Sequence, residues 1–251
     1  MAPRSAIIVL LAATGLVGCV NSHGFNRTAM SDTLQSIPMN HQPHQLAAPR
    51  LSMPFHLGVV FVHRTLTPSQ PLQPVEWLPV DGDILLRSLT PLQDEQILAD
   101  TFVLIDTVVP GESIDAIKQA GVQSGADAVL IVDAVSAVDR YNNGYASLYP
   151  TILGAYLAPG TESSALVMVS GTLWDVRSDW HTPIEAAEGK SKAVGSAFMV
   201  EDRTAVAEAK DTAIETFGKR VAERLWLMSE ELPRVGRYLR RIEPQEHSKQ
   251  E

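Results

Sequence analysis

The stretch Gly125-Ala126-Asp127-Ala128-Val129-Leu130-Ile131-Val132 decides the fold, and the rest of the chain can be worked out from it. Its aliphatic residues follow one another without alternation and continue through 134–138, which is typical of a strand covered on both faces. Upstream, Ser113 is placed to cap an amphipathic helix, and Phe102–Ile105 with Val108-Val109 predicts another strand. Strand, helix and strand in this order predict neighbouring strands joined by a right-handed crossover.

Two more elements precede this unit. Leu57–Val62 is a second continuous apolar run and predicts a strand of the same buried kind. A proline-rich stretch follows over 68–79, where regular structure is not expected. Thr90-Pro91 then predicts the start of a helix, with the threonine as cap and the proline as first helical residue.

Downstream of the stretch, the pattern changes to that of an antiparallel meander. Asn143-Gly144 lies between two extended segments and predicts a tight hairpin. Alternating residues over 166–176 predict a long central strand, Asp179–His181 a turn, and 183–198 a further extended segment.

The last element is the clearest helix, from about Asp202 to Leu232 with Pro233 ending it. Its apolar stripe consists of Val206, Ala213, Phe217, Val221, Leu225 and Met228, widened by Ile214 and Trp226. Charged residues, among them Lys210, are expected on the opposite side. The sequence therefore predicts an α/β (α+β) fold. It has a mixed sheet of about five to six strands with a long meander, two short helices and one long C-terminal helix packed on the sheet.

The N-terminal residues have the order of a secretory signal. Arg4 supplies a positive charge, and Ala6–Ala13 is an apolar run far shorter than the roughly 20 residues that span a bilayer. Leu16-Val17-Gly18-Cys19 then places an aliphatic residue, a branched residue and a glycine directly before the only cysteine of the chain. This arrangement resembles the bacterial lipobox, which implies cleavage after Gly18 and lipidation of Cys19.

The residues after the cysteine bear on which membrane would hold the anchor. Val20 and Asn21 follow Cys19, with no aspartate among them. In lipoproteins an aspartate at this place implies retention in the inner membrane, so we expect the periplasmic face of the outer membrane. Three acyl chains on one cysteine would anchor the protein durably, because a single chain binds only marginally.

The predicted domain plan has four parts: a signal peptide (1–18), a disordered tether (19–54), one α/β domain (55–232) and a charged tail (233–251). The tether holds His23, His41 and His44 at a spacing that a metal could use. No cysteine or acidic partner completes a site, so we interpret them as solvated spacers and expect no metal or cofactor.

Composition excludes some classes of partner. The 251-residue chain has a net charge of −9 and a pI near 5.3, which argues against nucleic-acid binding and against a polybasic membrane surface. With one cysteine, an intrachain disulfide is impossible.

Candidate chemistry is sparse. The chain has no P-loop, no H-E-x-x-H and no G-x-S-x-G motif. Ser178, Asp179 and His181 could supply a nucleophile, an orienting acid and a base if the fold brought them together. Asp127 and Asp133 are the residues considered for a carboxylate pair, although turn and solvent roles explain them as well.

A possible partner-binding surface lies at the predicted hairpin. Arg140, Tyr141 and Tyr145 place an arginine and two tyrosines at one tip, and these residue types are enriched in binding hot spots. The alternative is that tyrosines flank the turn because they suit strands.

Three segments resemble a known family: Gly125–Ile131, Thr151–Gly160 and Thr172–Arg177. They are similar to segments of the bacterial rhombotarget lipoproteins, over roughly residues 55–200, and the middle segment is the most specific. The layout is also similar to periplasmic domains such as the N-terminal domain of the Tol-system propeller protein and the curli-secretion lipoprotein. The resemblance implies a lipid-anchored envelope protein associated with rhomboid-type proteases, and it implies no catalytic residues.

Three hypotheses follow for function. The first is a non-enzymatic lipoprotein that scaffolds or binds an envelope protein through its sheet edge or the 140–160 hairpin, anchored in the membrane through Cys19. The second is an envelope hydrolase that uses His181. The third is a lipoprotein that binds a small ligand between the C-terminal helix and the sheet.

Overall fold

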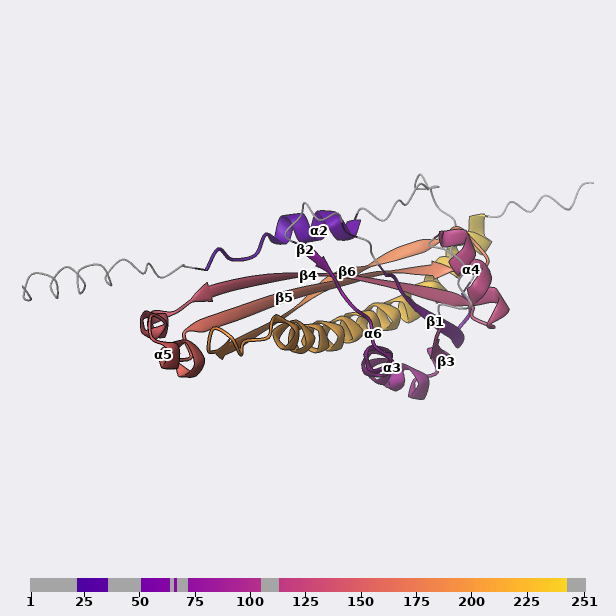
Figure 1. Ribbon diagram of the computed structural model, residues 1–251. Helices are drawn as coiled ribbons and strands as arrows, with labels where there is room; N and C mark the ends of the chain where they lie inside the picture. The colour runs from indigo at the N-terminus through magenta and orange to yellow at the C-terminus, as the bar shows by residue number, and fades with distance from the viewer. Residues whose placement is uncertain (1–21, 36–50, 64–65, 67–71, 105–112, 243–251) are drawn as a thin grey trace, which may run out of the picture.

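A mixed sheet of six strands forms the centre of the molecule and carries helices on both faces (Figure 1). The computed structural model describes residues 22–35, 51–63, 66, 72–104 and 113–242, with side chains as far as residue 230. The strands are β1 (Phe55–Phe61), β2 (Leu72–Pro74), β3 (Leu98–Val103), β4 (Ala128–Asn142), β5 (Thr161–Asp175) and β6 (His181–Gly195). The helices are α2 (Arg27–Gln35), α3 (Pro79–Asp94), α4 (Ile114–Gln123), α5 (Ile152–Leu157) and α6 (Asp202–Ile242), with a 3-10 helix η2 (Gly144–Leu148). The predicted fold class is confirmed.

The strand order is β3-β1-β4-β5-β6, with β2 paired to β4 beyond the end of β1. β1 is parallel to β3 and to β4, whereas β4, β5 and β6 form the predicted antiparallel meander. The expectation that β3 and β4 are neighbours is wrong, because β1 lies between them. Leu57 and Val59 of β1 belong to the main core on one face, and Val60 packs under α4 on the other, so the continuous apolar run is covered on both faces.

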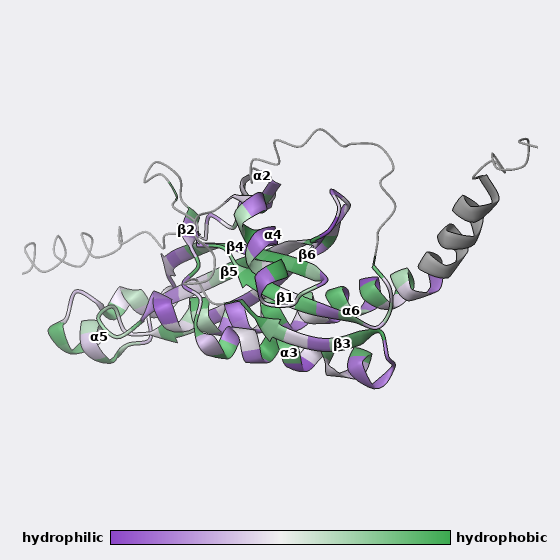
Figure 2. Cartoon of the chain, turned by 90° about the vertical axis from the view of Figure 1, so that its right-hand side faces the viewer, coloured by the Kyte–Doolittle hydropathy of each residue, from purple (hydrophilic) through white to green (hydrophobic). Residues whose placement is uncertain are grey.

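The two faces of the sheet are covered by different helices. Leu130 and Val132 of β4 belong to the main core, which α3 and α6 complete. Val129 and Ile131 point to the other face and pack under α4, and Val135 packs under α2. Figure 2 shows the apolar strands lying between these helical layers. Successive residues therefore alternate between two buried faces, which explains the absence of polar alternation in this strand.

Helix α6 lies unusually close to the meander. A Cβ added to Gly189 of β6 would overlap the carbonyl of Ala209, and Ala205 and Ala213 are fully buried beside it. Glycine in the strand and alanines in the helix thus let the two backbones approach. The larger residues Phe217 and Leu225 fill the core further along α6.

Helix α3 begins at Pro79, so the predicted start at Thr90-Pro91 is wrong. Pro79 is the first helical residue, and the side chain of Asp81 accepts a hydrogen bond of 2.6 Å from the backbone N–H of Leu78. Pro91 lies near the end of the helix. The apolar spacing of 85, 89 and 92 continues across it, and burial of these leucines outweighs the local Thr-Pro signal.

The prediction of a tight hairpin at Asn143-Gly144 is also wrong. Residues 143–160 connect β4 to β5 and contain η2 and α5. The side chain of Asn143 accepts a hydrogen bond from the N–H of Tyr145 and donates to the carbonyl of Pro159 and to Glu162. The asparagine therefore caps a helix and closes a long loop, whereas the prediction placed it in a tight hairpin.

Part of the predicted tether is folded. Residues 27–35 form α2, whose Met30 and Leu34 are buried against the sheet. Asn26 caps the helix by accepting from the N–H of Ala29 at 3.1 Å. Met30 and Leu34 lie one helical turn apart and indicate a helix with an apolar side. The polar composition of the segment around them obscured this signal. The lipobox with Gly18 and Cys19, and the histidines 41 and 44, lie outside the described residues.

The C-terminal helix also differs from prediction. Pro233 does not end it, because the helical backbone continues to Ile242 through residues that include several good helix formers. Trp226, expected to widen the buried stripe, is 44% exposed. Lys210, expected on the solvent side, is buried.

Candidate functional site

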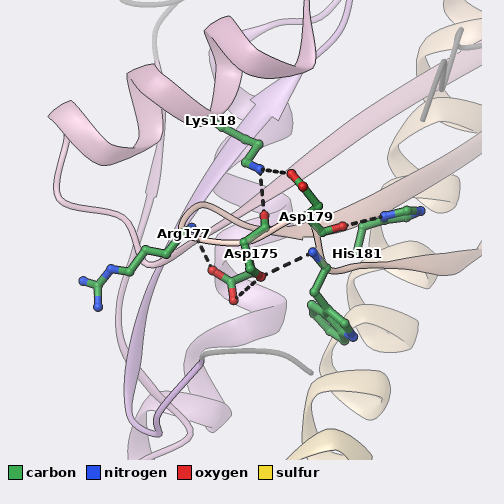
Figure 3. A network of polar contacts seen from close by, with 7 residues as sticks. Lys118, Asp175, Arg177, Asp179 and His181 are labelled. Atoms are coloured by element: carbon green, nitrogen blue, oxygen red, sulfur yellow. Dashed lines mark hydrogen bonds and ion pairs between the residues drawn. The ribbon is translucent and has the colours of Figure 1, made fainter. Parts of the chain in front are cut away.

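The turn between β5 and β6 carries a dense polar network (Figure 3). Buried Asp175 accepts hydrogen bonds of 2.8 Å from the N–H of Arg177 and from the hydroxyl of Ser178. Lys118 of α4 donates to the carbonyl of Ser178 at 2.7 Å and forms an ion pair of 3.3 Å with Asp179. The network ties this turn to α4.

The second hypothesis placed a nucleophile and a base in this turn. His181 stacks on the ring of Trp174, with centroids 4.3 Å apart, and its Nδ1 lies 3.3 Å from the carbonyl of Asp179. The hydroxyl of Ser178 is directed to Asp175, and no hydrogen bond joins it to His181 in this described turn. A nucleophile activated by a base needs that contact. The arrangement fixes a turn and gives no support to acyl transfer.

The two aspartates considered for acid–base work are separated. Asp127 lies just before β4, where it accepts from the N–H of His56 at 3.0 Å and pairs with Arg177 at 2.8 Å. Burial raises the pKa of Asp127, but the hydrogen bonds from His56 and the charge of Arg177 outweigh it, and the pKa is below its usual value. Asp133 is buried within β4, about 20 Å further along the strand. The two residues do not form a pair.

The residues predicted for a partner-binding tip lie at one end of the sheet. Arg140 donates to the carbonyl of Ala197 at 3.0 Å and lies 3.6 Å from Asp202. The ammonium of Lys192 lies 6.0 Å from the centroid of the Tyr141 ring. Tyr145 is 61% exposed on η2. The structure thus places Arg140 and Tyr141 in contacts with the body and leaves Tyr145 in solvent.

Just beyond these residues lies an exposed apolar surface, most of it within the 140–160 segment. We define the apolar tip as six exposed side chains of η2, α5 and the loop before α6: Leu148, Ile152, Leu153, Leu157, Phe198 and Met199. Helix α5 has no buried residue. The ring of Tyr156 stacks on that of Phe198 with centroids 4.9 Å apart, so α5 and the loop form one surface. Figure 1 shows α5 at the end of the β4–β5 pair that is opposite to α4.

An ion pair lies at the base of the tip. Glu162 lies 2.5 Å from Lys192. Hydrogen bonds from Lys192, Tyr141 and Asn143 lower the pKa of Glu162 to about 2. These bonds hold β4, β5 and β6 together where the loop 143–160 begins and ends.

The N-terminal segment is bound to the same end of β4. Ser22 donates to Asp139 at 2.5 Å, and the N–H of Gly24 donates to the same carboxylate at 3.0 Å. Burial raises the pKa of Asp139, but the bonds from Ser22, Gly24 and the backbone of His23 outweigh it and lower the pKa below its usual value. The segment before α2 is therefore fixed on the sheet.

The third hypothesis placed a ligand between α6 and the sheet. That interface is filled by the main core, but a cavity of about 630 Å³ lies at its edge between α2, β5, β6 and α6. Arg220 and Arg224 of α6 line it, and both already donate to β6, to the carbonyl of Ala186 and the hydroxyl of Thr182 respectively.

Lys210 and Asp81 form a buried ion pair that is not predicted from the sequence. The ammonium of Lys210 lies 2.7 Å from Asp81 and donates to the carbonyl of Glu76 at 2.9 Å, and both side chains are almost inaccessible. The signal was present, because Lys210 is four residues after Val206 and three before Ala213 on the apolar stripe. The pair joins α3 to α6 beside a cavity of about 400 Å³.

Among residues that the structure describes, no group of three or more metal-ligating side chains is placed to hold an ion. Within the same ranges, every helix is too short or too polar to traverse a bilayer.

Comparison with known proteins gives distant structural similarity only. No protein-family model matches the sequence, and no curated protein matches it significantly. The PelC dodecamer from Paraburkholderia phytofirmans is 17% identical, with 70% of this chain and 93% of that chain covered at a TM-score of 0.28. The hypothetical protein CT253 from Chlamydia trachomatis is 12% identical, with coverages of 70% and 96% and a TM-score of 0.29. Protein XCC0632 from Xanthomonas campestris, of family DUF330, is 13% identical, with coverages of 74% and 93% and a TM-score of 0.31.

Proposed function

We propose that this protein is a membrane-anchored periplasmic lipoprotein that acts without catalysis, as a scaffold or partner-binding protein of the cell envelope. The observation that carries the proposal is the position of Cys19, directly after Leu16-Val17-Gly18 at the end of a short apolar run. Val20 and Asn21 favour the outer membrane, and the resemblance to the rhombotarget lipoproteins supports a lipid-anchored envelope protein.

The free edge of β6 is a suitable surface for a partner. β6 pairs with β5 on one side, and within the described ranges no strand pairs with its other side. Beyond Pro183, which has no N–H, and the carbonyl of Ala186, which accepts from Arg220, the edge offers backbone N–H and C=O groups to an extended segment of another protein. Charged residues on this strand, among them Glu185 and Lys190, would limit pairing to a partner of matching charge.

The anchor is tested by intact mass and fractionation of protein made in its own host. We expect a mass that begins at an acylated Cys19, recovery with outer membranes, and release of the Cys19→Ser variant into the soluble periplasm. Ser22→Ala, which keeps the cysteine, is the matched control and should stay in the membrane. A bare thiol or a retained Met1 would refute the proposal.

The partner is tested with a photocrosslinking amino acid at Lys190 on the β6 edge, at Tyr145 on η2, and at Val122 as a remote exposed control. We expect one reproducible adduct from the position of Lys190 that disappears in the Cys19→Ser background. An adduct from the position of Tyr145 alone would place the partner-binding surface at the predicted tip of Arg140, Tyr141 and Tyr145 instead. Absence of an adduct at both positions would count against a scaffold role.

A second candidate is the binding of a small polar ligand in the cavity of about 630 Å³, which Arg220 and Arg224 line together with Glu185 and Glu223. An Arg224→Met variant should lose binding of such a ligand while Lys219→Met, on the exposed side of α6, keeps it. Equal binding by both variants would exclude this cavity.

A further inference from the structure

The apolar tip is built from a part of the chain that lacks charge altogether. Residues 143–160 contain no Asp, Glu, Lys or Arg, although one residue in five of the whole chain is charged. Residues 193–200, which supply Phe198 and Met199, are also uncharged. Ile152 is 81% exposed and Leu157 76%, so these side chains contribute little to the core. An exposed apolar surface of this kind marks a binding site.

The loop holds these side chains in place by its own hydrogen bonds. The hydroxyl of Thr151 caps α5 by accepting from the N–H of Gly154 at 2.9 Å. The hydroxyl groups of Tyr149 and Thr161 lie 2.8 Å apart, and Asn143 closes the two ends of the loop. Internal bonding explains how α5 stays folded without burying a residue. The apolar side chains therefore project outward from a fixed frame.

The N-terminal segment leads to the same end of the molecule. Traced backward from α2, which packs near Val135, the chain moves along β4 to Asp139, where Ser22 is bound. Asp139 is three residues before Asn142, the last residue of β4, a distance of about 10 Å. Cys19 precedes Ser22 by three residues and can therefore lie no more than about 11 Å from it. Ser22, the first described residue of the chain, thus lies toward the same end of the sheet as the apolar tip.

We propose that the apolar tip inserts into the same bilayer that holds the acyl chains of Cys19, so that the domain stands on the membrane at two points. This inference rests on the anchor proposed above. Aliphatic side chains enter the hydrocarbon, and the tyrosines at 145 and 156 suit the interface between lipid and water. The ion pairs of Arg140 and Glu162 remain at the base, in water. With a net charge of −9 the protein gains nothing from anionic lipid, so insertion depends on apolar contact.

The test uses the full lipidated protein with one added cysteine. Leu157→Cys places a thiol at the tip, and Val122→Cys places one on α4 at the other end of the molecule. In lipidated protein the sulfur of Cys19 is a thioether, so a fluorophore labels the added cysteine alone. The protein is reconstituted in vesicles of three parts phosphatidylethanolamine to one part phosphatidylglycerol, with bromine on the acyl chains.

We expect strong quenching of the label at Leu157→Cys and none at Val122→Cys. Unquenched label at both positions in protein whose mass shows acylated Cys19 would overturn the two-point contact and leave the anchor proposal intact. A mass without acyl chains, accompanied by labelling of Cys19, would overturn both. Shielding of the tip label that grows with protein concentration in the absence of vesicles would assign the surface to a second copy of this chain and overturn the inference.

A second measurement isolates the tip from the anchor. In the Cys19→Ser background, the triple variant Ile152→Ser, Leu153→Ser and Leu157→Ser should bind these vesicles at least roughly a hundredfold more weakly than its parent. Its melting temperature should be unchanged, because all three side chains are exposed. Binding by the parent should persist when salt rises from about 0.1 to about 0.5 M. Loss of binding in salt, or equal binding by the triple variant, would refute apolar insertion.

Discussion

Replacing Lys210 with methionine would remove the cation that lies against the buried carboxylate of Asp81. Methionine keeps most of the volume of the lysine stem, so the loss of packing is small. Two contacts disappear, the ion pair of 2.7 Å and the hydrogen bond of 2.9 Å to the carbonyl of Glu76. Asp81 would keep only the donor from Leu78, since its Oδ1 has no hydrogen-bond partner within the described structure.

The expected cost is dominated by the charge left behind. Removing one member of a buried pair typically destabilises a protein by about 3–5 kcal/mol. Because the folded body has roughly 150–250 residues, about 4 kcal/mol corresponds to a fall in the melting temperature of about 8–16 °C. Such a loss is a large part of the roughly 5–15 kcal/mol that stabilises an ordinary domain.

The assay is urea and thermal unfolding followed by far-ultraviolet circular dichroism. Lys219→Met, on the exposed side of the same helix, should change the free energy of unfolding by less than about 0.5 kcal/mol. The double variant Asp81→Asn, Lys210→Met removes both charges and should be more stable than Lys210→Met alone. If Lys210→Met cost no more than Lys219→Met, the carboxylate would be solvated and the reasoning refuted.

Three further predictions follow from the described contacts. Gly189→Ala should destabilise the folded protein by about 1–3 kcal/mol, because its Cβ would overlap the backbone of α6. Gly144→Ala, with open space around it, should be nearly neutral. Equal melting temperatures of the two variants would contradict the close packing. The folded-state pKa of Glu162 is about 2, below its unfolded value of 4.5, so the stability it contributes is present above pH 4.5 and is lost as the pH falls towards 2. The difference in stability between wild type and Glu162→Gln should therefore shrink over that window, and a difference independent of pH would disprove the linkage. Asp139→Asn should release the bound N-terminal segment and speed tryptic cleavage after Arg27, and an unchanged cleavage rate would show that the carboxylate does not hold it.

The sequence predicts elements well where one physical signal dominates. The continuous aliphatic run of β4 and the stripe of α6 apart from Trp226 are confirmed, because burial fixes them, and the cap of Ser113 on α4 is confirmed, because a local hydrogen bond fixes it. Ser113 accepts from the N–H of Ala116 as a capping residue should. Predictions fail where tertiary contacts outweigh a short motif, as at Thr90-Pro91, Asn143-Gly144 and the tether.

The features of the candidate site depend on contacts between distant segments. Nothing in the local sequence pairs Ser22 with Asp139, 117 residues away, or brings Phe198 against Tyr156. Residues 148–157 read equally well as a buried apolar strand, because hydrophobicity alone does not distinguish a core segment from an exposed one. The predicted face of Lys210 is wrong, because the prediction rests on the general exposure of charged residues.

With Cys19 lipidated as proposed, the bond between Ser22 and Asp139 would set how far the domain moves from the membrane. A free linker of 35 residues would let it range over roughly 30–35 Å, whereas the three residues from Cys19 to Ser22 span at most about 11 Å. A domain on so short a linker would stay next to the membrane and could not reach a distant ligand. Its partner would then have to come to the lipid surface or be embedded there.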